Sequence, residues 1–400
     1  MTIVVAGGTG LAGSAIVRAY QATGAEVIAL NRSVVDLLDR DATTAFLKKV
    51  KPSLVVDAAA KVGGIGANNA FPVEFLSDNV RIQSNLMEAA HAAEVEKFIF
   101  LGSSCIYPRG CAQPIKEEYL LTGPLEETNS AYAIAKIAGI ELIKSFRKEY
   151  ARKWISLMPT NLYGPRDNFE LQGSHVLPAF IRRFVEAQAE GRAKETLWGT
   201  GSPMREFLHV DDLASAVVMA GEKYDSAEHL NIGSGEDLTI KALAELVAEL
   251  AGFTGEIAWD SSKPDGTPRK LMDVSKLKKA GWQSTTSLEE GIALTYQWLL
   301  DNQTTLKVGD VILARGSVNN RPFVPGVPIG QVTTVDNAAG AVTQTADVKL
   351  YVNYSALSIV AVVVAAPKDD PRDALVPKAP VPTPVPTVTI YAQPSETPTP

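Results

Sequence analysis

Three residues with reactive side chains, Ser103, Tyr132 and Lys136, have a spacing that suits catalysis. A tyrosine and a lysine four residues apart on a helix lie on one face, so the ammonium can lower the pKa of the phenol. Such a phenol is a general acid for a sugar or alcohol oxygen. Tyr-x-x-x-Lys alone occurs by chance in many amphipathic helices, and a serine after a strand is often only a cap. Together, the three residues predict hydride transfer at a carbonyl that Ser103 binds and Tyr132 protonates.

The N-terminus carries a second motif, a glycine-rich turn. Gly7, Gly10 and Gly13 have the spacing of a dinucleotide-binding turn, in which the backbone approaches a pyrophosphate at a helix N-terminus. An apolar strand at 3–6 precedes the turn and a helix at 14–23 follows it, which is the context that this motif requires. We therefore predict that the cofactor contacts the turn residues Gly7, Gly8, Thr9, Gly10, Leu11, Ala12 and Gly13.

The end of the second predicted strand, 27–30, indicates which dinucleotide binds. An NAD site places an acidic residue there against the ribose 2′-hydroxyl, but this chain has Asn31-Arg32-Ser33. An arginine suits a 2′-phosphate instead. NADP(H) is therefore the predicted cofactor, and the alternative is that Arg32 is a solvated surface charge.

Short apolar strands alternate with amphipathic helices in the first part of the chain. The predicted strands lie at 3–6, 27–30, 54–59, 98–102 and 155–158. This alternation predicts an α/β fold with a Rossmann-type doubly wound parallel sheet, whose ligands bind at the carboxyl ends of the strands. Residues 1–167 thus form the predicted NADP-binding domain.

Longer helices follow from about residue 168 and predict a smaller α/β cap that binds substrate. They are expected at 175–190, 213–222, 240–251 and 288–302. We assign residues 168–302 mainly to this substrate-binding domain, with segments around 205–232 returning to the first domain.

The last quarter of the chain has a different composition. A seam is predicted at 303–307, and alternating segments at 330–335 and 346–352 predict a short all-β domain over 308–366. The last 25 residues contain eight of the 24 prolines, so residues 367–400 are predicted to form a disordered Pro-rich tail.

Composition excludes several classes of function. The formal charge of −7 lies wholly in residues 1–302, because residues 303–400 carry seven Lys plus Arg and seven Asp plus Glu. An acidic catalytic portion without a Lys/Arg block argues against nucleic acid as a partner. The two cysteines, Cys105 and Cys111, are not in a Cys-x-x-Cys spacing, which is typical of a reducing compartment. With no visible signal peptide and no long apolar run, we expect a cytoplasmic protein without membrane insertion.

Residues 1–302 resemble the extended short-chain dehydrogenase/reductase superfamily and, more closely, the GDP-L-fucose synthase family. The motifs that carry this resemblance are Ala58 to Ile65, Gly102 to Pro108, Tyr132 to Gly139, Pro159 to Pro165, Met204 to Asp212 and Lys263 to Lys270. Members of that family convert GDP-4-keto-6-deoxy-D-mannose to GDP-L-fucose by epimerising C3 and C5 and then reducing C4 with NADPH. The resemblance therefore implies a bifunctional epimerase/reductase that acts on a nucleotide-sugar.

The resemblance also assigns roles to individual residues. Tyr132 protonates O4 as hydride arrives, Lys136 holds the nicotinamide ribose, and Ser103 orients the keto group. Cys105 and His175 fall on the acid/base positions that exchange the protons at C3 and C5, since thiol and imidazole titrate near working pH. Without the resemblance, a buried cysteine and a helix-capping histidine would be the ordinary interpretation.

Further site residues follow from the same matching. The implied cofactor contacts beyond the glycine turn are Arg32, Leu101, Gly102, Ser103, Ser104, Lys136, Pro159, Thr160, Asn161, Leu162 and His175. The implied substrate contacts are Arg183, Trp198, Arg205 and Asp265, although Arg183 follows Arg182 on a helix and one of the two can be a solvated charge. No metal site is predicted. The family implies a homodimer built from helices around 75–91 and 131–147.

Residues 308–366 resemble a different family, the rod-shape-determining protein MreC, in its C-terminal β-domain. The matching segments are Gly309 to Ile312, Gly316-Ser317, Arg321 to Gly330 and Val360 to Val364. Two alternatives to the epimerase/reductase remain at this stage. One is another nucleotide-sugar epimerase or dehydratase on the same scaffold, and the other is a non-catalytic cell-envelope scaffold that acts through the C-terminal segment.

Overall fold

The computed structural model describes residues 1–171, 173–263, 265–302, 309, 311–313, 328–336 and 345–351. The chain divides into two compact units, Met1–Gln303 and Thr304–Pro400. The predicted seam at 303–307 and the predicted Pro-rich tail at 367–400 lie outside the described residues.

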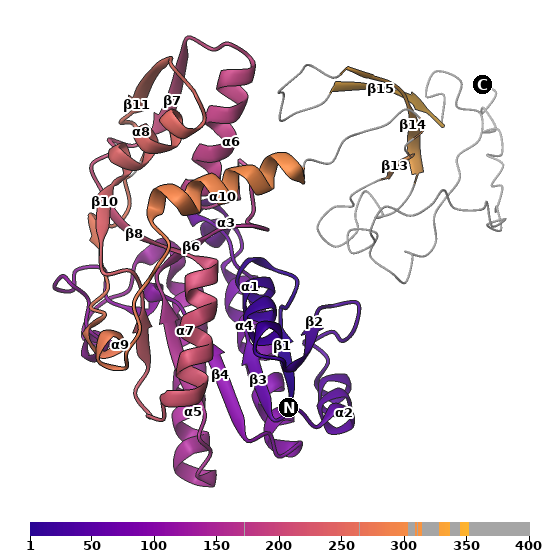
Figure 1. Ribbon diagram of the computed structural model, residues 1–400, viewed down its shortest axis with the longest axis vertical. Helices are drawn as coiled ribbons and strands as arrows, with labels where there is room; N and C mark the ends of the chain where they lie inside the picture. Colours follow the sequence, from indigo (N-terminus) through magenta and orange to yellow (C-terminus); the bar gives the residue numbers. More distant parts are fainter. Residues whose placement is uncertain are drawn as a thin grey trace, which may run out of the picture. The chain divides into compact units, whose positions relative to one another are not determined.

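A six-stranded parallel sheet forms the centre of the first unit, in the order β2-β1-β3-β4-β5-β9 (Figure 1). Its strands are β1 (Thr2–Ala6), β2 (Glu26–Leu30), β3 (Leu54–Asp57), β4 (Lys97–Leu101), β5 (Ile155–Pro159) and β9 (Leu230–Ile232). The four middle strands are buried almost throughout, as expected for a parallel sheet covered on both faces. The predicted Rossmann-type doubly wound sheet is confirmed.

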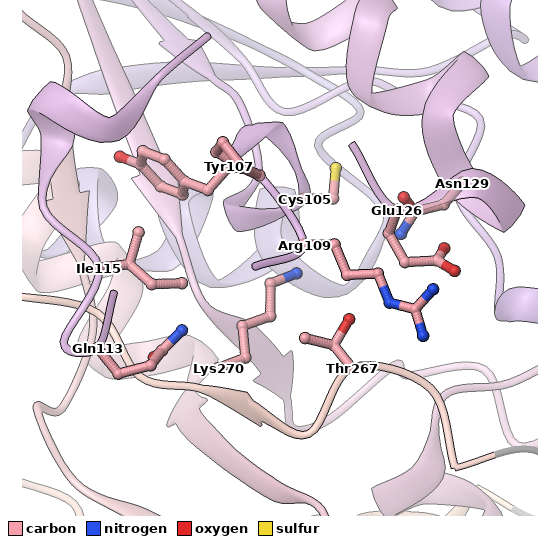
Figure 2. A pocket seen from close by; sticks show the side chains of 10 residues that line it. Cys105, Tyr107, Arg109, Gln113, Ile115, Glu126, Asn129, Thr267 and Lys270 are labelled. Carbon is pink, nitrogen blue, oxygen red and sulfur yellow. The ribbon is translucent and has the colours of Figure 1, made fainter. Parts of the chain in front are cut away.

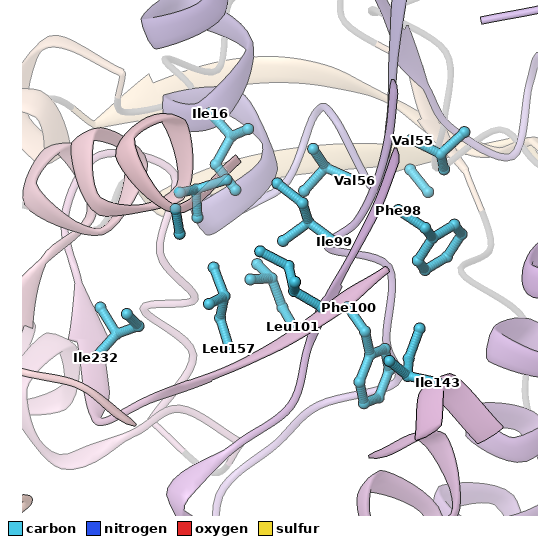
Figure 3. Packing of buried hydrophobic residues seen from close by; sticks show 14 of the residues in the cluster. Ile16, Val55, Val56, Phe98, Ile99, Phe100, Leu101, Ile143, Leu157 and Ile232 are labelled. Atoms are coloured by element: carbon cyan, nitrogen blue, oxygen red, sulfur yellow. The ribbon is translucent and has the colours of Figure 1, made fainter. Parts of the chain in front are cut away.

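Helices cover both faces of this sheet: α1 (Leu11–Ala22), α2 (Arg40–Val50), α4 (Pro72–Ala92), α5 (Ser130–Tyr150) and α7 (Val210–Lys223). Ile99 and Phe100 are adjacent in β4, so their side chains point to opposite faces of the sheet. A side chain added at Gly139 of α5 would strike the Phe100 ring, whereas one added at Gly221 of α7 would approach Ile99, so α5 and α7 cover opposite faces. Figure 3 shows the same division, with Ile143 of α5 beside Phe100 and Ile16 of α1 toward Val56 and Ile99.

Most other elements of the first unit form the smaller α/β part, whose helices are α6 (Val176–Ala189), α8 (Ile240–Leu250) and α10 (Leu288–Asp301) (Figure 1). Helix α3 (Ile65–Ala70) contacts α4, and α9 (Ser275–Lys279) contacts β9 and places Leu277 in the central core. Strands β6 (Asn161–Tyr163), β8 (Met204–His209), β10 (Asp237–Thr239) and β12 (Arg269–Lys270) form one sheet, while β7 (Lys194–Trp198) pairs with β11 (Glu256–Asp260). Short 3-10 helices lie at Ser104–Ile106 (η1), Glu117–Tyr119 (η2) and Glu127–Asn129 (η3).

The helix predicted at 213–222 is α7, which packs against α1 beside the central sheet. One helix boundary differs from its expectation. The helix predicted at 14–23 begins three residues earlier, at Leu11, because Gly10 occupies the N-cap position.

The described residues of the second unit form an antiparallel sheet of three strands, β13 (Val311–Leu313), β14 (Pro328–Asp336) and β15 (Thr345–Leu350). The predicted all-β character at 330–335 and 346–352 is therefore found at 330–335 and 346–350, and residue 352 lies outside the described residues. None of the described helices is both long and apolar enough to cross a membrane.

Candidate active site

The glycine-rich turn has a geometry that suits a dinucleotide pyrophosphate. Gly7 has a φ of +70°, and a side chain at Gly13 would collide with the Gly7 carbonyl, so both positions require glycine. At Gly10 an added Cβ would meet nothing closer than 3.5 Å, which leaves space outside the turn. Gly10 has no side chain to cap α1, so the backbone N–H groups of the first helical turn have no side-chain partner there. These N–H groups and the positive end of the helix dipole can bind a phosphate.

Arg32 lies where a 2′-phosphate would be expected, just after the end of β2. Asn31 accepts hydrogen bonds from the Ser33 backbone N–H (2.9 Å) and hydroxyl (2.6 Å), which folds the segment into a local turn. Arg32 itself is exposed and pairs with no acidic side chain among the described residues. Its guanidinium is therefore free for an anion, and the turn and this arginine together fit NADP(H).

Lys136 is buried at the carboxyl end of β4. Its ammonium donates a 2.9 Å hydrogen bond to the Leu101 carbonyl and lies 4.8 Å from the centre of the Phe100 ring. Tyr132 is one turn earlier on α5, with its ring centre 5.8 Å from the same ammonium. The structure thus brings together the tyrosine and the lysine that the sequence pairs.

The pKa of Tyr132 is shifted upward, opposite to the lowering expected from the sequence. Part of the residue is open to solvent, but its hydroxyl is surrounded by protein, and this burial is the main cause of the rise. Negative charge at Cys105 and at Asp57 raises this pKa further. The phenol is therefore protonated near neutral pH, as a group that donates a proton must be.

Ser103 and Cys105 follow β4 directly. The Ser103 hydroxyl accepts a 3.3 Å hydrogen bond from the Cys105 backbone N–H, so the serine does cap η1. A hydroxyl that accepts one bond still has a proton to donate, so capping does not prevent it from binding a carbonyl oxygen. Gly102 lies against Met158 of β5, with no space for a side chain.

Cys105 lines a small pocket together with Lys270, and Figure 2 shows the lysine side chain extending toward it. Burial raises the pKa of the thiol, whereas the Lys270 ammonium, the Ser103 hydroxyl and Lys136 act to lower it. Other residues that line this pocket include Tyr107, Arg109, Gln113, Glu126, Asn129 and Thr267. Sequence reasoning assigned no role to Lys270, because its proximity to Cys105 arises only from the fold.

His175 occupies the N-cap position of α6, but its side chain makes no capping hydrogen bond. The residue is exposed overall, yet protein surrounds the imidazole closely enough for desolvation to lower its pKa, and Lys270 lowers it further. Lys270 thus influences both predicted acid/base residues, Cys105 and His175.

The segment Pro159, Thr160, Asn161 and Leu162 joins the end of β5 to β6. Thr160 donates its backbone N–H to Ile232 of β9 at 3.0 Å, and the Asn161 amide donates to the Glu206 carbonyl at 2.7 Å. These bonds hold the segment at the carboxyl edge of the central sheet, the edge to which the glycine turn and Ser103 also belong.

Arg183 and Arg205 are both constrained by the cap. Arg183 donates to Glu195 at 2.6 Å and to the Thr196 carbonyl at 2.6 Å, while Arg182 pairs with Glu186 at 2.7 Å. Each of the two neighbouring arginines therefore has an acidic partner. Arg205 lies in β8 and is half-buried; burial lowers its pKa, and the charge of Asp265 opposes that shift.

Trp198 and Asp265 belong to neighbouring segments of the cap, because Asp265 lies against Gly199, the residue after Trp198. Asp265 accepts hydrogen bonds from the Thr200 backbone N–H (2.7 Å) and hydroxyl (2.8 Å), two residues beyond the end of β7. Trp198 ends β7 and is 69% exposed, with Lys263 lying 5.5 Å from the centre of its ring. An exposed aromatic face beside a fixed carboxylate can bind a flat, polar group.

Comparison with known proteins supports this description. The NAD dependent epimerase/dehydratase family model matches residues 3–233. GDP-L-fucose synthase 1 of Arabidopsis thaliana is 52% identical over 301 residues, which cover 75% of this chain and 93% of the relative. The chain belongs to the GDP-L-fucose synthase family. The GDP-L-fucose synthase of Escherichia coli (strain K12) is 48% identical over 311 residues, with 97% of its length covered.

Solved structures of related enzymes have the same fold as this GDP-L-fucose synthase family member. A GDP-L-fucose synthetase from Naegleria fowleri bound to NADP superposes with a TM-score of 0.70 at 31% identity, over 75% of this chain and 94% of that one. A GDP-6-OMe-4-keto-L-xylo-heptose reductase from C. jejuni gives a TM-score of 0.71 at 32% identity, over 75% of this chain and 97% of the other. A second family model, the barrel core of rod shape-determining protein MreC, matches residues 275–364.

Proposed function

We propose that residues 1–302 convert GDP-4-keto-6-deoxy-D-mannose to GDP-L-fucose by 3,5-epimerisation followed by NADPH-dependent reduction at C4. The observation that carries this proposal is the convergence of Cys105, Tyr132 and Lys136 at the end of β4. Lys136 is hydrogen-bonded to the last residue of that strand, and the charge of Cys105 acts on the Tyr132 hydroxyl. The high identity to named GDP-L-fucose synthases supports the same activity.

Epimerisation requires a base and an acid at carbons next to a carbonyl. Loss of a proton from C3 or C5 produces an enolate on the C4 oxygen, and return of a proton to the opposite face inverts the centre. Cys105 and His175 supply the thiol and the imidazole for this exchange. Lys270 favours the thiolate at Cys105 and the neutral form of His175, which are the forms that accept protons.

Reduction then uses Tyr132 as the acid. NADPH supplies the hydride to C4 when it is bound in the site. The Tyr132 hydroxyl gives its proton to O4, the Ser103 hydroxyl orients the keto group, and the Lys136 ammonium holds the nicotinamide ribose. A phenol with a raised pKa remains protonated until the alkoxide forms.

The cap supplies the proposed contacts to the nucleotide. Arg183 and Arg205 suit the diphosphate, while Trp198 offers an apolar face and Asp265 a hydrogen-bond acceptor. Arg183 and Asp265 already have protein partners, so both side chains are held in place before substrate arrives.

The direct test is incubation of the purified chain with GDP-4-keto-6-deoxy-D-mannose and NADPH. We expect NADPH oxidation, followed by absorbance, and GDP-L-fucose as the product, identified by chromatography and mass spectrometry. A folded sample that oxidises no NADPH with this substrate would contradict the proposal.

A second candidate function is reduction or epimerisation of a related GDP-sugar. A relative named GDP-L-colitose synthase from Yersinia pseudotuberculosis is 36% identical over 305 residues. A comparison of kcat/KM for 6-deoxy and 3,6-dideoxy 4-keto substrates distinguishes the two candidate functions. The non-catalytic scaffold alternative predicts no turnover of either.

We also propose a cytoplasmic homodimer. The chain has only two cysteines, Cys105 and Cys111, and they form no disulfide with each other, which supports a reducing compartment. The long helices α4 and α5 pack side by side and are the proposed dimer elements. One chain has a mass of 42.7 kDa, and light scattering of the purified protein should give twice that mass.

A further inference from the structure

A carboxyl group with no assigned role, that of Asp57, lies at the end of β3. The three residues before it, Leu54, Val55 and Val56, are apolar, and all four are buried. Asp57 is completely inaccessible to solvent. A buried carboxylate is costly unless it is paired or hydrogen-bonded, so an aspartate at the end of an apolar strand needs a specific explanation.

The hydrogen bonds of Asp57 are incomplete. One oxygen, Oδ1, accepts the backbone N–H of Ala59 at 3.2 Å. The other, Oδ2, has no hydrogen-bond partner within the described part of the chain. The turn after β3 therefore satisfies only one of the two carboxylate oxygens.

Strand pairing places Asp57 near Lys136. Asp57 of β3 is the register partner of Phe100 in β4, and the Lys136 ammonium lies over the Phe100 ring and donates to the next carbonyl, that of Leu101. A lysine ammonium has three protons to donate, and Lys136 uses one in this bond. The carboxylate of β3 and the ammonium of α5, which rests on the neighbouring strand β4, thus lie near each other without a direct ion pair.

The electrostatic shifts agree with this arrangement. Burial raises the pKa of Asp57 to about 6, and the positive charge of Lys136 opposes that rise. Burial lowers the pKa of Lys136, and the negative charges of Asp57 and then Cys105 oppose that fall. Asp57 also raises the pKa of Tyr132. The groups that act on the Lys136 ammonium are therefore Asp57 from β3 and Cys105 from η1.

We propose that Asp57 is a positioning residue for the reduction step, whose carboxylate keeps Lys136 as an ammonium and Tyr132 as a phenol. This inference rests on the proposed function and extends it to a residue that does not touch the substrate. Above about pH 6 the carboxylate is charged and supports both acidic forms. Removing it should make both groups lose their protons at lower pH.

The first test measures Lys136 directly, without turnover. NMR of the chain labelled with carbon-13 at the lysine Cε, recorded as a function of pH and assigned with Lys136→Arg, gives the midpoint for deprotonation of Lys136 without a reagent that must reach the buried ammonium. In Asp57→Asn this midpoint should fall by about one pH unit or more. Asp57→Val, which matches Val55 on the same face of β3, should give the same shift and provides a folded variant if the asparagine is not tolerated.

Asp39→Asn is the matched control, because Asp39 is an exposed N-cap of α2 and asparagine caps equally well. Its Lys136 midpoint should equal that of the unmodified chain. An unchanged midpoint in both Asp57 variants would overturn the inference.

The second test follows the reaction. The basic limb of the pH profile for NADPH-dependent reduction should move to lower pH by the same amount in Asp57→Asn, while deuterium exchange at C3 and C5 stays at the rate of the unmodified chain. A parallel loss of reduction and exchange at every pH, with an unmoved limb, would indicate a purely structural role and refute the inference. If the Asp57 variants show the Lys136 shift but the unmodified chain oxidises no NADPH, the proposed function alone fails.

Discussion

Tyr132 and Cys105 act on different steps of the proposed reaction, so their substitutions should separate the steps. Tyr132→Phe removes the proton donor for O4 and should lower the rate of reduction by about a hundredfold or more, while epimerisation continues. Cys105→Ser replaces a thiol by a hydroxyl that does not ionise near neutral pH, and it should stop both steps, since reduction follows epimerisation. Deuterium exchange at C3 and C5 and NADPH oxidation measure the two steps separately. Normal exchange in Cys105→Ser would contradict the assignment of the thiol.

Lys270 should determine the reactivity of the Cys105 thiol. Burial raises the pKa of the thiol and the Lys270 ammonium lowers it, so Lys270→Met should raise the pH midpoint for alkylation of Cys105 by iodoacetamide, by about one unit. The measurement uses a Cys111→Ser background, in which Cys105 is the only remaining cysteine. Lys263→Met, which changes an exposed lysine over Trp198, is the control. Equal midpoints in the two methionine variants would show that Lys270 does not act on the thiol.

At the residue scale, sequence reasoning found the side chains of known motifs but not their electrostatic environment. The Tyr132/Lys136 spacing correctly predicted a shared helix face. The direction of the Tyr132 pKa shift was wrong, because the sequence does not show that the hydroxyl is buried and subject to the negative charges of Cys105 and Asp57. Lys270 and Asp57 had no local signal, since each acts on a residue far away in the chain.

At the scale of the elements, the sheet could be predicted because its strands are continuous apolar runs, and helices separate most of them. The sixth strand, β9, was not predicted as such, since it has only three residues and its place beside β5 depends on a long-range pairing. The cap was less predictable than the sheet for the same reason. Its strands are short and pair with partners that lie far apart in sequence, such as β7 with β11.

Glu206 of β8 links three separate segments, and its ionisation should affect stability. Its carboxylate accepts backbone N–H groups from Gly235 (2.7 Å) and Met272 (2.9 Å), and burial raises its pKa to about 7. A carboxyl whose folded pKa exceeds its unfolded value stabilises the protein at low pH, and this contribution is lost as pH rises through the folded pKa. The free energy of unfolding should therefore fall between pH 5 and 8, by on the order of 3 kcal/mol from this group.

Glu206→Gln does not titrate, so its stability should change less over that range. Urea unfolding at pH 5 and pH 8 measures the difference, and Glu236→Gln, an exposed neighbour, provides the control. An equal loss of stability in Glu206→Gln and in the unmodified chain would show that Glu206 does not carry this pH dependence.

At the scale of the whole molecule, two family resemblances meet within one chain, and they disagree about where the second begins. The MreC barrel core matches from residue 275, but α9 and α10 belong to the first compact unit, which extends to Gln303. Ile292, Thr295 and Leu299 of α10 are buried there, and α10 contacts α8 and β8. Packing therefore assigns α9 and α10 to the enzyme, and the second unit begins at Thr304.

This boundary predicts the result of truncation. A chain that ends at Asn302 keeps every element of the first unit, so its thermal midpoint and its NADPH oxidation rate should equal those of the full chain. A chain that ends at Thr286 lacks α10 and exposes its buried contacts on α8 and β8, so it should unfold at a lower temperature or fail to fold. Thermal unfolding followed by circular dichroism, with the NADPH assay, distinguishes the two. A large loss of stability or activity in the chain ending at Asn302 would mean that the C-terminal segment is an integrated part of the enzyme.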